Sequence, residues 1–443
     1  MKLIYLTAGA GGMFCGSCMH DNALSRALAD YGWDIQLVPT YTPIRTDEKD
    51  VSVDQVLFGG VNVYLQQKIP LLRYVPAFLD RFLDSPWLIR RVTSRAMETN
   101  PTMLGKLAVS MLKGKHGNQR KEVKQLCKWI QLSKPGLVIF SNILIGGCIE
   151  SIKQETQIPV LVTLQGDDVF LDSLKEPYRS QCLSEIRKIV PHVDGFLVQS
   201  EFFRDYMSDY FSIDPAKFHV TPLGIDVTEF EPYLSRGHSP FKDRRPTIGY
   251  LARLANEKGL HHLVDAFIHL KTEMLDSDPL VESIFLKIAG WMGPDHRDYA
   301  EAQFQRMVDA GLAEDFEYVG SIERDEKLEF LGQIDLLSVP TEFLEPKGIY
   351  ALEALAAGVP VVLPEHGAFP ELVRPSKGGV LVPPRDPRAL ASAWLSVLTD
   401  HQMRQELASA GQAYVHSQRN SESMAESTTR VIERLTGHSH QAP

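Results

Sequence analysis

The segment 342–362 carries the densest group of side chains in the sequence that could bind or transform a ligand. Glu345 precedes Gly348, at which a helix is expected to begin, and Glu353 lies within that helix. Glycine lets the backbone approach a ligand closely, and the N–H groups of a helix start favour an anion. Here those N–H groups belong to Gly348, Ile349 and Tyr350. Two flanking carboxylates disfavour a phosphate and favour sugar hydroxyls, although the spacing also fits a capping glutamate followed by an ordinary helical one.

The segment 249–259 places two cations around the start of another expected helix. Arg253 follows an expected strand, and Lys258 comes directly before the helix. Cations held close in a dry cleft stabilise a leaving group that gains negative charge. From the residues alone, solvated surface charges are the more common explanation.

Cys15 and Cys18 form a Cys-x-x-Cys motif near the start of the first expected helix. Such a pair could have lowered thiol pKa values and cycle as a dithiol, or hold a metal with His20 as a third ligand. No second cysteine pair completes a structural zinc site. The favoured interpretation is two small residues packed beside a cleft.

These residues need a scaffold, and the first forty residues already indicate one. An apolar strand at 3–6, a helical pattern at 22–31 and a second strand at 35–38 alternate in the βαβ manner. The turn after the first strand holds a glycine cluster that includes Gly11 and Gly12. Taken alone this cluster is weak evidence of a ligand site, because tight strand-to-helix turns need glycine for steric reasons.

Further short buried strands follow, interrupted near 66–128 by basic helical stretches that are typical of an insertion. The polar, Pro- and Gly-containing stretch 235–245 is typical of a linker, and a second α/β unit begins there. We therefore expect an α/β protein of two Rossmann-like doubly wound domains facing across a cleft. The expected bounds are 1–238 for the first domain, 244–415 for the second, and 416–443 for a C-terminal helix and tail.

The composition is that of a folded protein: of 443 residues, 44% are hydrophobic and 23% are charged. These values exclude a disordered, collagen-like or disulfide-scaffold chain. A formal net charge of −10 disfavours nucleic-acid partners. Five cysteines, an odd number, point to a reducing compartment. No uninterrupted apolar run reaches the ~18 residues that a membrane-spanning helix needs, so we expect a cytoplasmic protein.

One part of the sequence is nevertheless basic. Residues 51–150 carry 14 Lys and Arg against 6 Asp and Glu, and 104–128 alone carry seven Lys and Arg against one Glu. Basic amphipathic stretches favour anionic membranes or phosphate-bearing acceptors, whereas a solvated helical face is the more common explanation. Peripheral contact with the inner membrane surface therefore stays open.

The order of these motifs resembles that of the family 4 glycosyltransferases of GT-B fold. Glu345 and Glu353 match the family's E-x7-E signature, together with the trailing Ala354, Gly358, Pro360 and Val361. The segment 249–259 resembles the donor-diphosphate segment, 222–226 the P-N-G-hydrophobic-D turn, and 200–202 the S-x-hydrophobic element. The resemblance covers nearly the whole chain and is strongest from Val198 to Val382.

The resemblance implies retaining transfer of a sugar from a nucleoside diphosphate sugar, without a metal or other cofactor. The acceptor could be a glycan, a lipid-linked molecule or a small molecule. The family's pattern also implies a C-terminal helix, around 421–435, that crosses back to the first domain. The implied catalytic residues are Arg253 and Lys258, on the diphosphate, and Glu345, on the sugar. The implied donor-binding residues are Gly11, Gly12, Gln165, Gly348, Ile349, Tyr350 and Glu353, the last of these on the ribose.

Two positions depart from the family pattern. Gln165 stands where family members commonly place a histidine; it cannot titrate, but it can hydrogen-bond a sugar. Asp167 or Asp168 could orient an acceptor, although loop aspartates more often form turns. Leu223 replaces the usual asparagine, which puts a side-chain contact from that turn in doubt.

Other functions stay open from the sequence alone. They are an epimerase or phosphorylase on the same fold, and a noncatalytic or redox-gated sugar-nucleotide-binding protein that signals through Cys15 and Cys18. Product analysis and a test for any donor turnover separate them. A nicotinamide oxidoreductase is disfavoured, because no G-x-G-x-x-G motif follows a strand with an acidic residue at the end of the next one.

Overall fold

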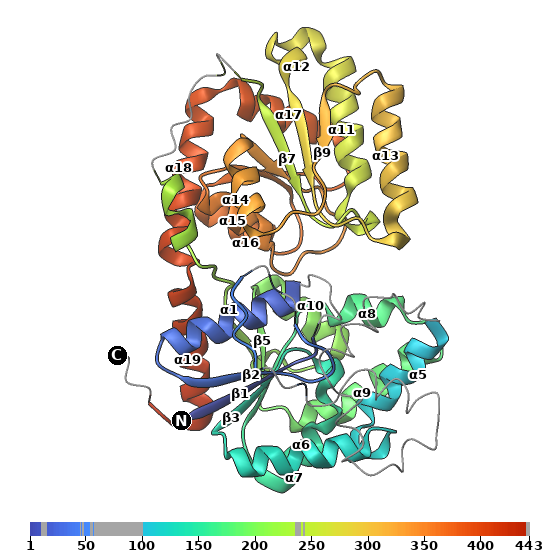
Figure 1. Ribbon diagram of the computed structural model, residues 1–443, viewed down its shortest axis with the longest axis vertical. Coiled ribbons are helices and arrows are strands. Elements are labelled where there is room, and N and C mark those ends of the chain that lie inside the picture. The colour runs from blue at the N-terminus through green and yellow to red at the C-terminus, as the bar shows by residue number, and fades with distance from the viewer. Residues whose placement is uncertain are drawn as a thin grey trace. The chain divides into compact units, whose positions relative to one another are not determined.

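The computed structural model describes residues 1–9, 16–44, 46, 48–53, 56, 101–234, 241 and 244–439. The chain divides into two compact units, residues 1–222 with 424–443 and residues 223–423. Each unit is built on a six-stranded parallel sheet flanked by helices (Figure 1). The predicted fold class, two Rossmann-like α/β domains, is confirmed.

The sheet of the first unit has the strand order β2-β1-β3-β4-β5-β6. Its strands are β1 (Lys2–Thr7), β2 (Asp34–Pro39), β3 (Leu137–Phe140), β4 (Val160–Thr163), β5 (Gly195–Val198) and β6 (Phe218–Val220). Leu3 pairs with Ile35 on one side and Leu137 on the other. All four residues of β3, β4 and β5 are buried, as expected where helices cover both faces of a parallel sheet.

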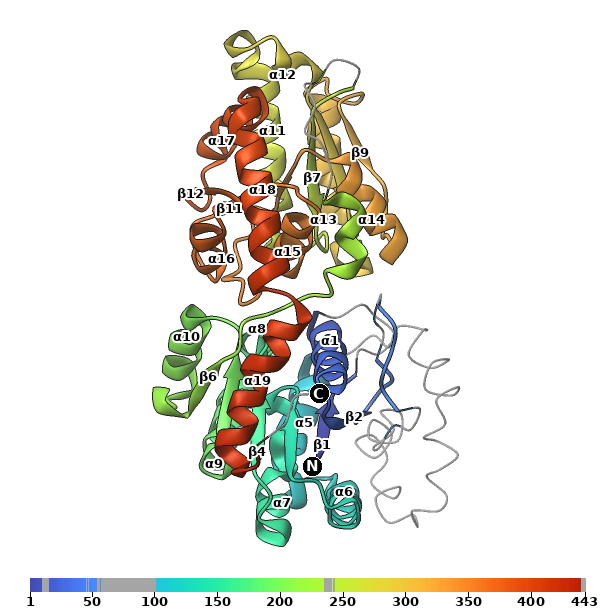
Figure 2. The same ribbon diagram turned by 90° about the vertical axis from the view of Figure 1, so that its left-hand side faces the viewer.

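The α-helices described in this unit are α1 (Gly16–Asp30), α5 (Pro101–Leu112), α6 (Arg120–Ser133), α7 (Ile149–Thr156), α8 (Asp167–Ser173), α9 (Tyr178–Ile189), α10 (Glu201–Phe211) and α19 (Ser421–Thr436). The last helix of the chain, α19, belongs to this first unit (Figure 2). The indole N–H of Trp33 donates to the hydroxyl of Thr429 on α19 at 2.9 Å, and Met424 and Ile432 of α19 are buried.

The sheet of the second unit has the order β12-β11-β10-β7-β8-β9. Its strands are β7 (Thr247–Leu251), β8 (Phe285–Ala289), β9 (Phe316–Tyr318), β10 (Leu336–Ser338), β11 (Val361–Pro364) and β12 (Gly379–Val382). Its described α-helices are α11 (Leu260–Glu273), α12 (Leu280–Ser283), α13 (Arg297–Asp309), α14 (Arg324–Gln333), α15 (Ile349–Ala356), α16 (Phe369–Ser376), α17 (Pro387–Thr399) and α18 (His401–Gln418).

The units divide after Pro222, whereas the sequence placed the boundary at 238. The short 3-10 helix Thr228–Tyr233 packs on the second unit, where the hydroxyl of Tyr233 donates to the carbonyl of Leu328 at 2.8 Å. Most of the expected linker, 235–240 and 242–243, lies outside the described residues.

The expected basic insertion at 66–128 is described only from residue 101 onward, where it forms α5, a 3-10 turn and α6. In that part Lys115 pairs with Glu150 at 3.3 Å. Contact of this stretch with a membrane stays a prediction. Across the described residues, no helix combines the length and apolar character that a membrane crossing needs.

Gly259, between Lys258 and α11, offers a test of how the backbone positions this segment. Its φ is +71°, and an added Cβ would lie 1.8 Å from the carbonyl oxygen of Pro340. Gly311 has a similar φ of +80° but open space around it. Both alanine substitutions cost about 1–2 kcal/mol for the left-handed backbone, and we expect Gly259→Ala to lose a further ~1–3 kcal/mol from the clash.

Urea unfolding followed by circular dichroism measures the two losses. Gly311→Ala is the matched control, because it changes the backbone conformation without the steric contact. Equal losses in the two variants would show that the contact with Pro340 is not tight.

Candidate active site

The candidate site of the second unit lies where its strand order reverses. β7 and β10 are neighbours although they are not consecutive; the chain winds from β7 to β8 and β9 on one side, and from β10 to β11 and β12 on the other. Parallel α/β sheets bind ligands at such a reversal, at the carboxyl ends of the strands. The loop after β7 leads to Lys258 and the loop after β10 to Glu345.

Lys258 and Glu345 meet there in an ion pair, with 2.5 Å between the Nζ of the lysine and the Oε2 of the glutamate. Burial raises the pKa of Glu345, but the charge of Lys258 and the backbone N–H of Gly348 more than offset this and hold the pKa below its ordinary value. The hydroxyl of Tyr350 also donates to Oε2, at 3.4 Å. The site therefore keeps a buried, ionised carboxylate beside a lysine ammonium.

Aromatic rings further enclose the ammonium group of Lys258. Its Nζ lies 5.5 Å from the ring centre of Phe343 and 5.7 Å from that of Tyr350. Cations are attracted to the faces of aromatic rings at such distances. Two rings and one carboxylate thus hold the ammonium in place.

The helix start expected at Gly348 is present, since α15 begins with Ile349 and Tyr350. Gly348 has a φ of +66°, and an added Cβ would lie 3.0 Å from the ring of Phe369. The carboxylate of Glu345 accepts from the backbone N–H of Gly348. The glutamate itself therefore takes the position that an anion favours at a helix start.

Arg253 lies on the same loop but not in the ion pair. Its guanidinium contacts Glu257 at 3.0 Å, and its side chain is 47% exposed. The structure therefore brings Lys258 to Glu345 and leaves Arg253 at the surface. A role for Arg253 on a diphosphate stays a prediction.

Glu353 lies in a separate buried ion network. Its Oε1 accepts from the guanidinium of Arg324 at 2.6 Å and from the Nζ of Lys327 at 2.7 Å, and the side chains of all three are at least 90% buried. Arg324 also contacts Glu229, its Nε donating at 2.8 Å. No motif in the sequence pointed to Arg324, Lys327 or Glu229 as partners of Glu353. The contact of Glu353 with a ribose stays a prediction.

The first unit has a polar pocket at its own strand reversal, between β1 and β3. It has a volume of about 170 Å³, and its lining includes Cys18, Asp21, Gln165 and Asp167. The amide nitrogen of Gln165 donates to Asp21 at 2.7 Å and to the carbonyl of Ser141 at 2.8 Å. The structure therefore places the predicted Gln165 in a pocket at the carboxyl ends of the strands.

Asp21 is the centre of this polar network, and sequence reasoning did not identify it. Its carboxylate accepts from the hydroxyl of Tyr5 at 2.8 Å and from that of Thr7 at 2.7 Å. Asp167 is also buried and accepts from the backbone N–H groups of Gln165 and Ile143. Burial outweighs these two hydrogen bonds and raises the pKa of Asp167 to about 6.

A larger pocket of about 300 Å³ lies beside the polar one in the first unit. Its lining is mainly apolar and includes Leu104, Leu107, Met111 and Phe170. The two pockets share Ala8, Gly9, Asn142 and Leu144.

Three predicted site residues, Gly11, Gly12 and Cys15, lie outside the described residues. Cys18 is buried in α1 and lines the polar pocket. A redox or metal role for the Cys-x-x-Cys motif stays a prediction.

Comparison with known proteins identifies the class to which this chain belongs. Residues 112–229 match the family model described as Glycosyltransferase Family 4, and residues 234–414 match that described as Glycosyl transferases group 1. The second match contains Lys258, Glu345 and Glu353. The chain belongs to the family 4 glycosyltransferases of GT-B fold, which confirms the resemblance found in the sequence.

Individual relatives are distant. The chain is 29% identical over 248 residues to a glycogen synthase of Mycobacterium tuberculosis, and the match spans 55% of each chain. It is 25% identical over 293 residues to a GDP-mannose-dependent phosphatidylinositol monomannoside mannosyltransferase of Corynebacterium glutamicum, covering 63% of this chain and 71% of the relative. The chain thus spans about half the length of the glycogen synthase.

Solved structures show the same fold at low identity. Sucrose-phosphate synthase of Thermosynechococcus elongatus superposes with a TM-score of 0.68 at 18% identity, covering 99% of this chain and 100% of that one. HepE of Anabaena, solved in complex with UDP, gives 0.67 at 15% identity, with 98% and 100% covered.

The ion network around Glu353 predicts a large loss of stability on substitution. Removing one partner of a buried ion pair leaves a buried charge uncompensated and costs about 3–5 kcal/mol. We expect Glu353→Gln to lower the free energy of unfolding by that amount. Glu301→Gln is the matched control, because Glu301 pairs with Arg297 at the exposed surface, where one substitution costs at most ~1 kcal/mol. Denaturant unfolding measures both, and similar losses would contradict the network's importance.

Proposed function

We propose that the protein is a glycosyltransferase that moves a sugar from a nucleoside diphosphate sugar to an acceptor hydroxyl, with retention of the anomeric configuration. The observation that carries the proposal is the ion pair of Lys258 and Glu345 at the strand reversal of the second unit. Membership of the family 4 glycosyltransferases supports the reaction class.

The chemistry of the pair suits departure of a diphosphate. As the bond from the anomeric carbon to the phosphate oxygen breaks, its electron pair passes to the diphosphate, and the ammonium of Lys258 stabilises the added negative charge. The ionised Glu345 accepts hydrogen bonds from sugar hydroxyls while its ion pair holds Lys258 in place. Arg253 adds a second cation from the same loop. No side chain is assigned as nucleophile or general base.

For the donor we propose only the chemical class, a nucleoside diphosphate sugar. One relative of this chain is described as GDP-mannose-dependent, and one structural neighbour was solved with UDP. UDP and GDP sugars are therefore the donors to test first, and ADP sugars complete the screen. We propose that neither a metal nor another cofactor takes part in the transfer.

For the acceptor we propose a molecule with both a polar and an apolar part, held in the first unit. The polar pocket with Asp21, Gln165 and Asp167 offers hydrogen bonds to hydroxyls, and the adjoining pocket with Leu107 and Met111 offers apolar contact. Among the predicted acceptors, this arrangement favours a lipid-linked one over a wholly polar glycan.

The proposal predicts the effect of substitutions in the donor loop. Loss of a group that stabilises charge in the transition state costs about 2.7–4 kcal/mol, or 100-fold to 1000-fold in turnover. We expect Lys258→Ala and Arg253→Ala each to lower the release of nucleoside diphosphate from a donor sugar by about 100-fold or more. Arg297→Ala is the control, because Arg297 forms the same i,i+4 pair with Glu301 as Arg253 forms with Glu257.

Turnover in both loop variants equal to that of Arg297→Ala would remove the diphosphate assignment. Nuclear magnetic resonance of the product gives the anomeric configuration, and inversion would contradict a retaining reaction. Binding of donor without transfer or hydrolysis would favour the noncatalytic alternative, and a product without a new glycosidic bond would favour an epimerase or phosphorylase.

A further inference from the structure

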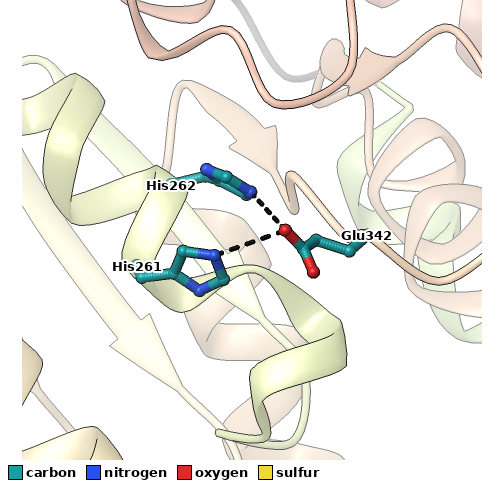
Figure 3. A group of neighbouring side chains, drawn as sticks. All are labelled: His261, His262 and Glu342. Atoms are coloured by element: carbon teal, nitrogen blue, oxygen red, sulfur yellow. Dashed lines mark hydrogen bonds and ion pairs between the residues drawn. The ribbon is translucent and has the colours of Figure 1, made fainter.

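His261, His262 and Glu342 form a compact cluster next to the candidate site (Figure 3). The two histidines lie in the first turn of α11, and Glu342 lies in the loop after β10. One carboxylate oxygen, Oε1, is 2.8 Å from the Nε2 of His262 and 3.5 Å from the Nε2 of His261. All three candidate ligand atoms lie within 4.8 Å of one another.

We propose that these three side chains bind one divalent transition-metal ion, with zinc as the reference ion. Two imidazole nitrogens and one carboxylate oxygen are a donor set that zinc binds at about 2.0–2.2 Å, with water completing the coordination. Ligand atoms around a tetrahedral ion at that bond length lie about 3.4 Å apart, so shifts of about 1 Å convert the cluster into a coordination site. Imidazole ligands select such ions over calcium or magnesium, which prefer oxygen alone.

Hydrogen bonds, charges and burial shift the pKa values of two members of the cluster. The hydrogen bond from His262, together with the charge of Arg385, holds the pKa of Glu342 below its ordinary value. Burial and the neighbouring His262 lower the pKa of His261. Because a carboxylate only accepts, the Nε2 of His262 carries the proton in the present hydrogen bond. A bound ion would replace that proton, which moves to Nδ1 of the same ring.

A further residue orients one of the ligands. The hydroxyl of Tyr299 lies 2.8 Å from the Nδ1 of His261, and it also accepts from the backbone N–H of His261 at 3.1 Å. This contact holds the ring by one nitrogen and turns the other, Nε2, toward Glu342 (Figure 3). Metal-binding histidines are commonly fixed in this way through the nitrogen that does not bind the ion.

Arg385 is the competitor for the same carboxylate. Its Nε lies 3.2 Å from the Oε1 of Glu342, and its side chain is 67% exposed. An exposed arginine can turn into solvent when an ion binds. Removal of the charge of Arg385 should therefore strengthen metal binding. If the cluster serves only as a hydrogen-bonded link between α11 and the loop after β10, no metal should bind.

The ion would act on the loops that carry the candidate site. His261 lies three residues after Lys258, and Glu342 lies three residues before Glu345. A metal bound by both segments would join the two loops that the ion pair of Lys258 and Glu345 also joins. The proposal concerns binding and does not depend on the glycosyltransferase reaction.

Calorimetric titration of the chelator-treated full chain with zinc chloride tests the proposal. The titration uses the Cys15→Ser, Cys18→Ser double variant, so that zinc bound by the cysteine motif cannot contribute to the measured heat. The expected result is about one equivalent of bound zinc, with affinity lowered at least tenfold by His262→Ala and by Glu342→Gln. His269→Ala is the control, because His269 lies on the same helix and pairs with Glu273 outside the cluster.

Arg385→Gln should raise the zinc affinity, and thermal unfolding in chelator checks that every variant is folded. Three results would each overturn the proposal. They are no zinc binding, an unchanged zinc affinity in each of the single variants His262→Ala and Glu342→Gln, and a lower zinc affinity in Arg385→Gln.

Discussion

The buried ion pair of Lys258 and Glu345 is the interaction that the candidate site depends on. Its partners come from two loops that are 87 positions apart in the sequence. Two distant segments of the backbone must therefore hold the ammonium nitrogen and the carboxylate oxygen 2.5 Å apart. The adjacency of β7 and β10 brings the loops together. Gly259 and Gly348, both with positive φ, then let the two helices begin close to the neighbouring residues Pro340 and Phe369. Desolvating two charges is costly unless geometry of this kind compensates for it.

The sequence predicted those features that depend on neighbouring residues. Strands alternate with helices, Gly348 begins a helix, and Lys258 precedes one, because turn chemistry and hydrophobic periodicity are local properties. The predicted roles of Glu345 and Lys258 followed from motifs that resemble those of a glycosyltransferase family. Their mutual contact did not, since strand order alone decides which loops are neighbours.

The features that the sequence did not reveal are contacts between distant positions. Arg324 and Lys327 precede Glu353 by 29 and 26 positions. Their local sequence predicts no more than exposed, charged side chains on a helix. Asp21 lies within α1, yet its partners come from β1 and from Gln165, 144 positions away. The boundary expected at 238 lies later in the chain than the observed division after Pro222. The segment 228–233 packs on the second unit, and its amino-acid composition does not indicate this packing.

We propose that a nucleoside diphosphate binds at the loops of Lys258 and Glu345. Amide hydrogen exchange read by mass spectrometry, with and without UDP, GDP or ADP, locates the bound nucleotide on the chain. We expect slower exchange in peptides from 252–262 and from 341–352, with no change in 297–309 of α13. A nucleotide that binds measurably but slows exchange in neither loop would contradict it.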